Sequence, residues 1–195
     1  MAPLRWSRMA LITTLCAVCL SGCSAPPAAT PPPPAPAPSA STPAPVTRPD
    51  LRTLLIDEAD IPVPGFQPPN AQPLAEDAVD GLVARFDSAD GERQVGVTIV
   101  LLPDAAAAQD AMQGAASSTL EQRTGTRSAS AAVGDRAVLF TDYRLAGTAS
   151  TLLLFSQGKA SVAMEFRSPE TDPIPADAVL AAGARQASRL KSAFG

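Results

Sequence analysis

The 195-residue chain contains no histidine, and only 4% of its residues are aromatic. The missing histidine excludes Ser-His-Asp and Cys-His catalysis, histidine-ligated zinc and a histidine pH switch. The chain also has no glycine-rich phosphate-binding loop and no dinucleotide fingerprint. The sequence therefore predicts no catalytic residues of these kinds, no metal site and no cofactor.

Cysteine is scarce as well. The three cysteines are Cys16, Cys19 and Cys23, all close to the N-terminus. Because none follows Cys23, a domain formed by the rest of the chain has no disulfide framework. Its stability must come from an apolar core.

The phrase Leu-Ser-Gly-Cys at 20–23 has the form of a bacterial lipobox. It ends an uncharged apolar stretch that is too short to span a membrane, and Arg5 and Arg8 precede that stretch. This arrangement predicts a signal peptide over residues 1–22 and a diacylglycerol on the thiol of Cys23. Acyl chains on Cys23 would hold the protein at the outer face of the cytoplasmic membrane, in the cell envelope. The alternatives are an ordinary secretory signal with a chance cysteine, or a short buried helix.

A proline- and alanine-rich segment follows Cys23 and extends to residue 49, with Arg48 as its single charge. This composition favours an extended polyproline-II tether, about 80 Å long at about 3.1 Å per residue. A spacer is the simplest interpretation, and recognition by a partner or glycosylation are the alternatives. The candidate glycosylation sites are Thr30, Ser39, Ser41, Thr42 and Thr47.

The chain beyond the predicted signal is acidic. Of 15 basic residues Arg5 and Arg8 lie in the signal, so 13 remain against 19 acidic residues, a net charge of −6. Such a chain has no electrostatic basis for binding nucleic acid or an anionic membrane surface. We therefore expect no nucleic-acid partner, and contact with the membrane through the acyl chains alone.

Residues 50–195 have the length of one domain. Apolar periodicity predicts strands at 82–86, 94–102, 136–143, 151–156 and 160–168, and helices at 105–121 and 176–194. They follow a lead-in at 50–66 that starts as a short amphipathic helix, is ended by Pro62 and Pro64, and continues with Gly65 and Phe66 as a turn. The segments at 67–73 and 122–135 are expected as loops, and 74–79 as a helical turn. The order β-β-α-β-β-β-α predicts an α+β fold, with helices packed on a five-stranded antiparallel sheet.

Two local signals support the first hairpin and the first helix. The Asp-Gly step at 90–91 lies between two apolar runs and marks a hairpin turn. Asp104 is the expected N-cap of the helix that follows. The residues expected on the buried face of that helix are Ala105, Ala108, Met112, Ala115 and Leu120.

A second row of apolar residues lies on the sheet face opposite the main predicted core. It consists of Val100, Leu102, Val138, Phe140, Leu152 and Leu154. Either the lead-in, with Leu54, Leu55, Ile61 and Phe66, covers this face, or the face lines a ligand cavity. In the second case the candidate ligand-binding residues are Val138, Phe140, Leu152 and Leu154.

Three weaker patterns do not define a catalytic or metal site. Ser-x-x-Lys occurs at 156–159 and 188–191, but the later motifs of penicillin-binding enzymes are missing. The acidic cluster Asp87, Asp90 and Glu92 lacks the alternation of a calcium-binding loop, which favours a solvated turn. Carboxylate-pair hydrolysis remains an alternative because acidic residues are plentiful.

The lipobox, the tether and the phrases Leu54-Leu55…Ile61-Pro62…Gly65-Phe66 and Val133-Gly134-Asp135 resemble small actinobacterial, mycobacterial-type cell-envelope lipoproteins. The element order is more loosely similar to extracytoplasmic sensor-like domains of that group. The resemblance implies location and architecture more than a reaction. We expect a lipid-anchored, non-enzymatic module that binds an apolar or lipid-like ligand or an envelope protein. The alternatives are a structural interaction protein of the envelope and a carboxylate-dependent cell-wall hydrolase.

Overall fold

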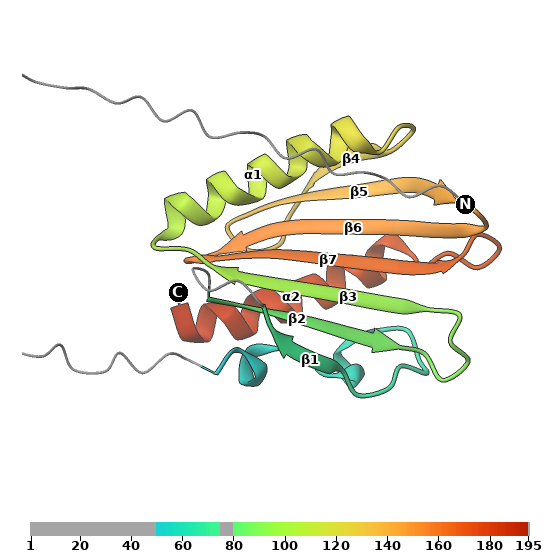
Figure 1. The fold of residues 1–195 in the computed structure, drawn as a ribbon, viewed down its shortest axis with the longest axis horizontal. Helices are drawn as coiled ribbons and strands as arrows, with labels where there is room; N and C mark the ends of the chain where they lie inside the picture. Colours follow the sequence, from blue (N-terminus) through green and yellow to red (C-terminus); the bar gives the residue numbers. More distant parts are fainter. Residues whose placement is uncertain (1–49, 75–79, 195) are drawn as a thin grey trace, which may run out of the picture. The chain divides into compact units, whose positions relative to one another are not determined.

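The computed structural model describes residues 50–74 and 80–194. The chain divides into two units, Met1–Pro45 and Val46–Gly195, and the described residues all belong to the second. Its elements are η1 (Leu51–Leu54), η2 (Glu58–Asp60), β1 (Asn70–Pro73), β2 (Asp80–Asp87), β3 (Gln94–Leu101), α1 (Ala105–Gln122), β4 (Arg127–Ala131), β5 (Arg136–Leu145), β6 (Thr148–Gln157), β7 (Ala160–Pro169) and α2 (Ala176–Phe194). The strands form one antiparallel sheet in the order β1-β2-β3-β7-β6-β5-β4 (Figure 1).

The predicted five-stranded sheet is wrong, because the sheet has seven strands. The two additional strands, β1 and β4, form its edges and lie in segments that were expected to be loops. Neither has an apolar alternation, since their sequences are NAQP and RSASA and most of their residues are exposed. Backbone pairing with β2 and β5 forms these strands, and hydrophobic periodicity does not report backbone pairing.

The five strands and two helices that were predicted are all present, with ends that differ by a few residues. Asp104 caps α1, since its side chain accepts a hydrogen bond from the backbone N–H of Ala107 at 2.8 Å. The first hairpin is present, but only Gly91 of its Asp-Gly step has a positive φ. The two-residue turn with positive φ at both positions lies instead at Ala146-Gly147, between β5 and β6. The predicted helical turn at 74–79 falls, apart from residue 74, outside the described residues.

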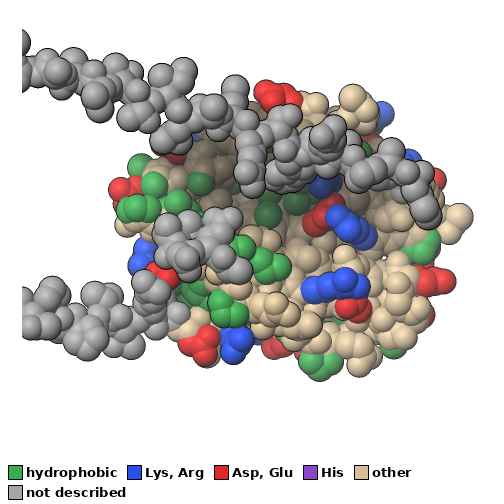
Figure 2. All heavy atoms as spheres, viewed as in Figure 1, with side chains coloured by type: hydrophobic (Ala, Val, Ile, Leu, Met, Phe, Trp, Pro, Cys, Tyr) green, Lys and Arg blue, Asp and Glu red, His purple; other side chains and the backbone are tan. Residues whose placement is uncertain are grey.

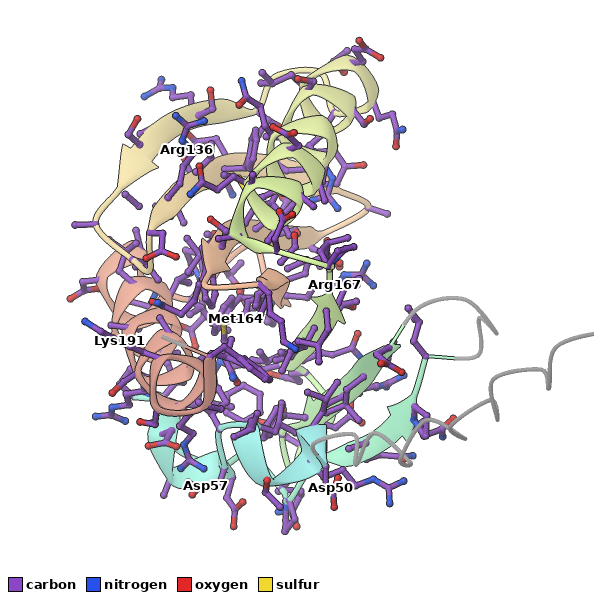
Figure 3. All side chains as sticks on the ribbon, turned by 90° about the vertical axis from the view of Figure 1, so that its left-hand side faces the viewer. Asp50, Asp57, Arg136, Met164, Arg167 and Lys191 are labelled. Atoms are coloured by element: carbon purple, nitrogen blue, oxygen red, sulfur yellow. The ribbon has the colours of Figure 1, made fainter. Side chains whose placement is uncertain are left out.

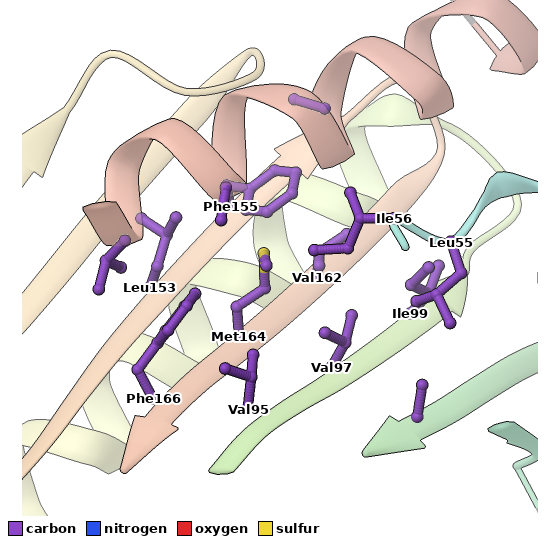
Figure 4. Packing of buried hydrophobic residues seen from close by; sticks show 14 of the residues in the cluster. Leu55, Ile56, Val95, Val97, Ile99, Leu153, Phe155, Val162, Met164 and Phe166 are labelled. Carbon is purple, nitrogen blue, oxygen red and sulfur yellow. The ribbon is translucent and has the colours of Figure 1, made fainter. Parts of the chain in front are cut away.

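The main core lies between the sheet and α2. Alternate residues of β7, Val162, Met164 and Phe166, point to this side and are at most 2% exposed. They pack with equivalent residues of the neighbouring strands and with the apolar face of α2 (Figure 4). Burial of such a continuous set is the main stabilising term for a domain without disulfides.

The lead-in does not cover the second apolar row, which was one of the two alternatives for that face. Its apolar residues, Leu51, Leu55, Ile56, Ile61 and Phe66, join the α2-side core. The second apolar row is instead covered by α1, which lies on the opposite side of the sheet from α2 (Figure 3). Met112 and Ala116 pack with this row and Ala108 is also buried, whereas Ala105 and Ala115 are exposed and Leu120 is 51% exposed. The predicted face of this helix was therefore only partly right.

Gln186 fixes the position of the lead-in on α2. Its side chain is fully buried, donates from Nε2 to the carbonyl of Leu54 at 2.8 Å and accepts the N–H of Ile56 at 3.0 Å. Arg189, one turn further along α2, donates to the carbonyl of Leu55 at 2.8 Å and to Asp57 Oδ2 at 2.9 Å. The hydrogen bond from Arg189 lowers the pKa of Asp57 below its ordinary value. The irregular lead-in thus has its backbone groups satisfied by side chains of α2.

We expect Gln186→Leu to lower the free energy of unfolding by about 2–4 kcal/mol. Leucine fills a similar volume but leaves the Leu54 carbonyl and the Ile56 N–H without partners. Urea unfolding of the two proteins measures the difference. Gln122→Leu, at an exposed position near the end of α1, is the matched control and should change stability by less than about 0.5 kcal/mol. Equal stability of the two variants would contradict this role of Gln186.

Candidate binding cleft between α1 and β4

An open cleft of about 540 Å³ runs between α1 and the edge of the sheet formed by β4 and β5. We call it the α1–β4 cleft. It exists because α1 packs on β6 and β7 and leaves the β4 side of this face uncovered. Its lining consists of Met112, Gln113, Ala116, Ser117, Leu120, Ser128, Ala129, Ser130, Arg136, Ala137, Val138 and Phe140. The volume is within the range of small-molecule sites, about 300–1,000 Å³.

The floor of the α1–β4 cleft is apolar and its outer wall carries hydroxyl groups. Phe140 and Val138 of β5 form the floor, and Met112 contacts them from α1. Ser128 and Ser130 of β4 lie directly opposite Phe140 and Val138 in the antiparallel register, so they share the same face. The cleft therefore offers apolar contact at its base and hydrogen-bonding groups along its rim.

One end of the cleft is defined by a contact between β5 and α1. Arg136 Nη1 donates to Gln113 Oε1 at 2.9 Å. Figure 3 shows Arg136 beside α1, at the start of β5. Arg136 is the single charged residue in the lining, and the described residues provide no carboxylate partner for it.

β5 contains a β-bulge near the end of the cleft that lies away from Arg136, and this bulge changes which side chains lie on the α1 side of the sheet. Phe140 pairs with Leu152, but Tyr143 pairs with Ser150, so β5 has one more residue here than β6. Asp142, within the bulge, has a φ of 64°, a conformation uncommon for a residue with a side chain. Residues three apart normally face opposite sides of a sheet, and the bulge places Tyr143 on the same side as Phe140.

Tyr143 belongs to a polar network under the C-terminal end of α1. The Arg123 guanidinium lies 4.7 Å from the centre of the Tyr143 ring and 2.9 Å from Glu165 Oε1. Ser150 Oγ donates to the same carboxylate oxygen at 2.9 Å, and Arg167 Nη2 is 2.7 Å from the other one. Burial by itself would raise the pKa of Glu165. The hydrogen bonds from Ser150 and Arg167, with the charge of Arg123, outweigh burial and lower that pKa.

The network lies at the edge of the α1-side apolar cluster, and its one uncompensated charge is exposed to solvent. Two guanidinium groups share one carboxylate, and the remaining charge is on Arg167, which is 51% exposed. Figure 2 shows this face of the molecule, with basic and acidic side chains side by side over the sheet. The network fits a structural role better than that of a catalytic pair, since its only carboxylate accepts hydrogen bonds from three side chains.

The four ligand-binding residues expected from the sequence lie together on the α1 side. Val138 and Phe140 line the α1–β4 cleft, whereas Leu152 and Leu154 are buried beneath α1 in the same cluster. Val100 and Leu102 are half-buried and lie outside that cluster. The sequence did not indicate Ser128, because β4 was expected to be a loop. It did not indicate Gln113 or Arg136 either, because they are polar residues of a predicted helix and a predicted strand and belong to no apolar row.

The weaker sequence patterns remain without catalytic geometry. Lys159 of the first Ser-x-x-Lys match lies 5.1 Å from the centre of the Phe194 ring, and in the second match Ser188 and Lys191 are exposed on α2. Asp87 is paired with Arg85 at 2.8 Å and Asp90 accepts from Ser88 at 2.5 Å. Over residues 50–74 and 80–194, no acidic residues gather in a group suited to a metal ion.

Comparison with known proteins gives similarity at the level of structure. No protein-family model matches the chain, and no curated protein does. The extracellular domain of PknH from Mycobacterium tuberculosis is similar in structure, with a TM-score of 0.48 and 14% sequence identity over 72% of this chain and 94% of that chain. At this degree of similarity, no site or function passes from that domain to the present chain. In the part of the chain that the structure describes, no helix meets the length and hydropathy needed to cross a membrane.

The lowered pKa of Glu165 predicts a specific pH dependence of stability. Between this lowered pKa and the ordinary value of 4.5, the unfolded state binds more protons than the folded state. The contribution of Glu165 is therefore complete above about pH 4.5 and is lost as the pH falls through the folded-state pKa. Glu165→Gln should have a lower free energy of unfolding than wild type at pH 7. As the pH falls from about 4.5 through the folded-state pKa, its free energy of unfolding should decrease less than that of wild type.

Urea unfolding at a series of pH values measures this effect. Asp110→Asn is the matched control, because Asp110 is exposed on α1 and has no ion-pair partner within the described residues. It should retain the wild-type pH dependence. A Glu165→Gln profile parallel to that of wild type would show that the network does not hold the carboxylate in its charged form.

Proposed function

We propose that this protein is a lipid-anchored, non-enzymatic binding module of the cell envelope, and that it binds a small molecule in the α1–β4 cleft. The single observation that carries the binding function is the cleft itself, with an apolar floor and a hydroxyl-bearing rim in one place. The anchor rests on the lipobox at 20–23, which precedes the described residues.

The absence of enzymatic machinery is part of the same proposal. The chain has no histidine, and the cleft lining contains no acidic residue and no cysteine. Carboxylate-pair hydrolysis needs two acidic groups facing a shared substrate. Glu165, which lies on the same sheet face, is occupied by Arg123, Arg167 and Ser150. A binding role therefore fits the cleft better than the hydrolase alternative.

Cys23→Ala should move the protein from the membrane fraction to the soluble fraction, because alanine has no thiol to acylate. Fractionation of cells followed by immunoblotting measures the distribution. Cys19→Ala is the matched control, since Cys19 lies ahead of the proposed cleavage point and should not affect attachment. Retention of the Cys23→Ala protein in the membrane fraction would disprove the anchor.

Ser130→Trp should reduce ligand occupancy by filling the cleft from β4. Tryptophan is well tolerated in strands, and Ser130 is exposed, so the sheet should remain intact. Native mass spectrometry of the protein purified from its own membrane would compare the bound small molecules in wild type and variant. Ser192→Trp, at an exposed position on α2, is the control. Equal occupancy in all three proteins would rule out the cleft as the binding site.

A further inference from the structure

The charge of the α1–β4 cleft differs from that of the protein around it. The chain has 19 acidic and 15 basic residues, yet the lining of the cleft has no acidic residue and one basic residue, Arg136. Arg136 is exposed, and the one hydrogen bond that its side chain donates among the described residues goes to Gln113. A guanidinium has five N–H donors, so most of its donors remain available to a ligand.

The apolar part of the lining extends away from this charge in one direction. From Arg136 to Phe140 the chain advances four residues along β5, about 13 Å at the usual rise of a strand. On the opposite wall, α1 advances from Gln113, which contacts Arg136, to Leu120, about 10 Å along the helix axis. Met112 lies beside Gln113 at the charged end, and Ala116, Phe140 and the 51% exposed Leu120 lie further along this path. The cleft is thus polarised, with a cation at one end and apolar surface along its length.

We propose that the ligand of this cleft is a single-chain amphiphile with one carboxylate head group. The carboxylate binds Arg136, whose planar guanidinium matches it with two parallel hydrogen bonds. The chain lies against Leu120 and the half-buried Val138, above the buried Phe140 and Met112, and the hydroxyl groups of Ser128 and Ser130 remain at the rim. This assignment rests on the proposed function, because it names the class of ligand for the same cleft.

Two probes can distinguish how much the apolar chain and the carboxylate each contribute to the binding affinity. Decanoate carries both parts, and decanol carries the chain without the charge. The Cys23→Ala chain is used throughout, so that no detergent competes for the cleft. Isothermal titration calorimetry at pH 7, below the concentration at which the probes form micelles, should give about tenfold or tighter binding of decanoate than of decanol. Added salt should weaken the binding of decanoate and leave that of decanol unchanged.

Substitutions at Arg136 test the head-group contact directly. Arg136→Gln should weaken decanoate binding about tenfold and leave decanol binding unchanged, and Arg136→Lys should retain part of the preference because it keeps the charge. Arg144→Gln is the matched control, since Arg144 is an exposed arginine on the same strand that does not line the cleft. Unchanged unfolding midpoints would show that each variant is folded.

The possible results separate this inference from the proposed function. Equal affinity for the two probes, or no effect of Arg136→Gln, overturns the carboxylate contact. If Ser130→Trp does not reduce decanoate binding, decanoate binds outside the cleft and the inference is overturned. The absence of decanoate binding would overturn it as well. The proposed function fails only if Ser130→Trp also leaves the material that copurifies with the protein unchanged.

Discussion

The hydrogen bonds of Gln186 determine which face of the sheet the lead-in covers, and the rest of the architecture follows from that choice. The strands β5, β6 and β7 have apolar residues on both faces, so each face needs a cover. Since Gln186 and Arg189 hold the lead-in on the side of α2, α1 is the single helix that residues 50–74 and 80–194 place over the other face. One helix does not cover the whole width of that face, and the uncovered strip beside β4 is the cleft.

The polar network at the end of α1 has a complementary role. Glu165 and Arg123 bring charge onto a sheet face that is otherwise apolar here, and Tyr143 is available to this network because of the bulge at Asp142. Removing an ion pair from water is costly unless further hydrogen bonds complete it, and Ser150 and Arg167 supply these to the partly buried Glu165. The network ends the apolar cluster on one side, while Arg136 and Gln113 end the cleft on the other.

Sequence reasoning identified the elements whose side chains carry a periodic signal. The alternation of β7 and the apolar spacing of α2 predicted both elements almost to their ends, because burial selects those residues. It missed β1 and β4, which are held by backbone pairing with exposed side chains. The same limit applied to the residues of the cleft. The sequence indicated Val138 and Phe140, because they belong to the second apolar row. Arg136 and Ser128 gain their relevance from the position of β4 and from Gln113 across the gap. The position of β4 and the contact with Gln113 both depend on the tertiary structure, and no local sequence pattern reports them.

The attachment of the lead-in to α2 also determines how tension along the chain reaches the domain. Any pull on the chain ahead of Asp50 acts first on η1 and η2, which are joined to α2 by the side chains of Gln186 and Arg189. That connection lies on the face opposite α1, so the force passes through the larger core before it reaches β5. The lining of the cleft is thus on the other side of the sheet from the point where such a pull acts.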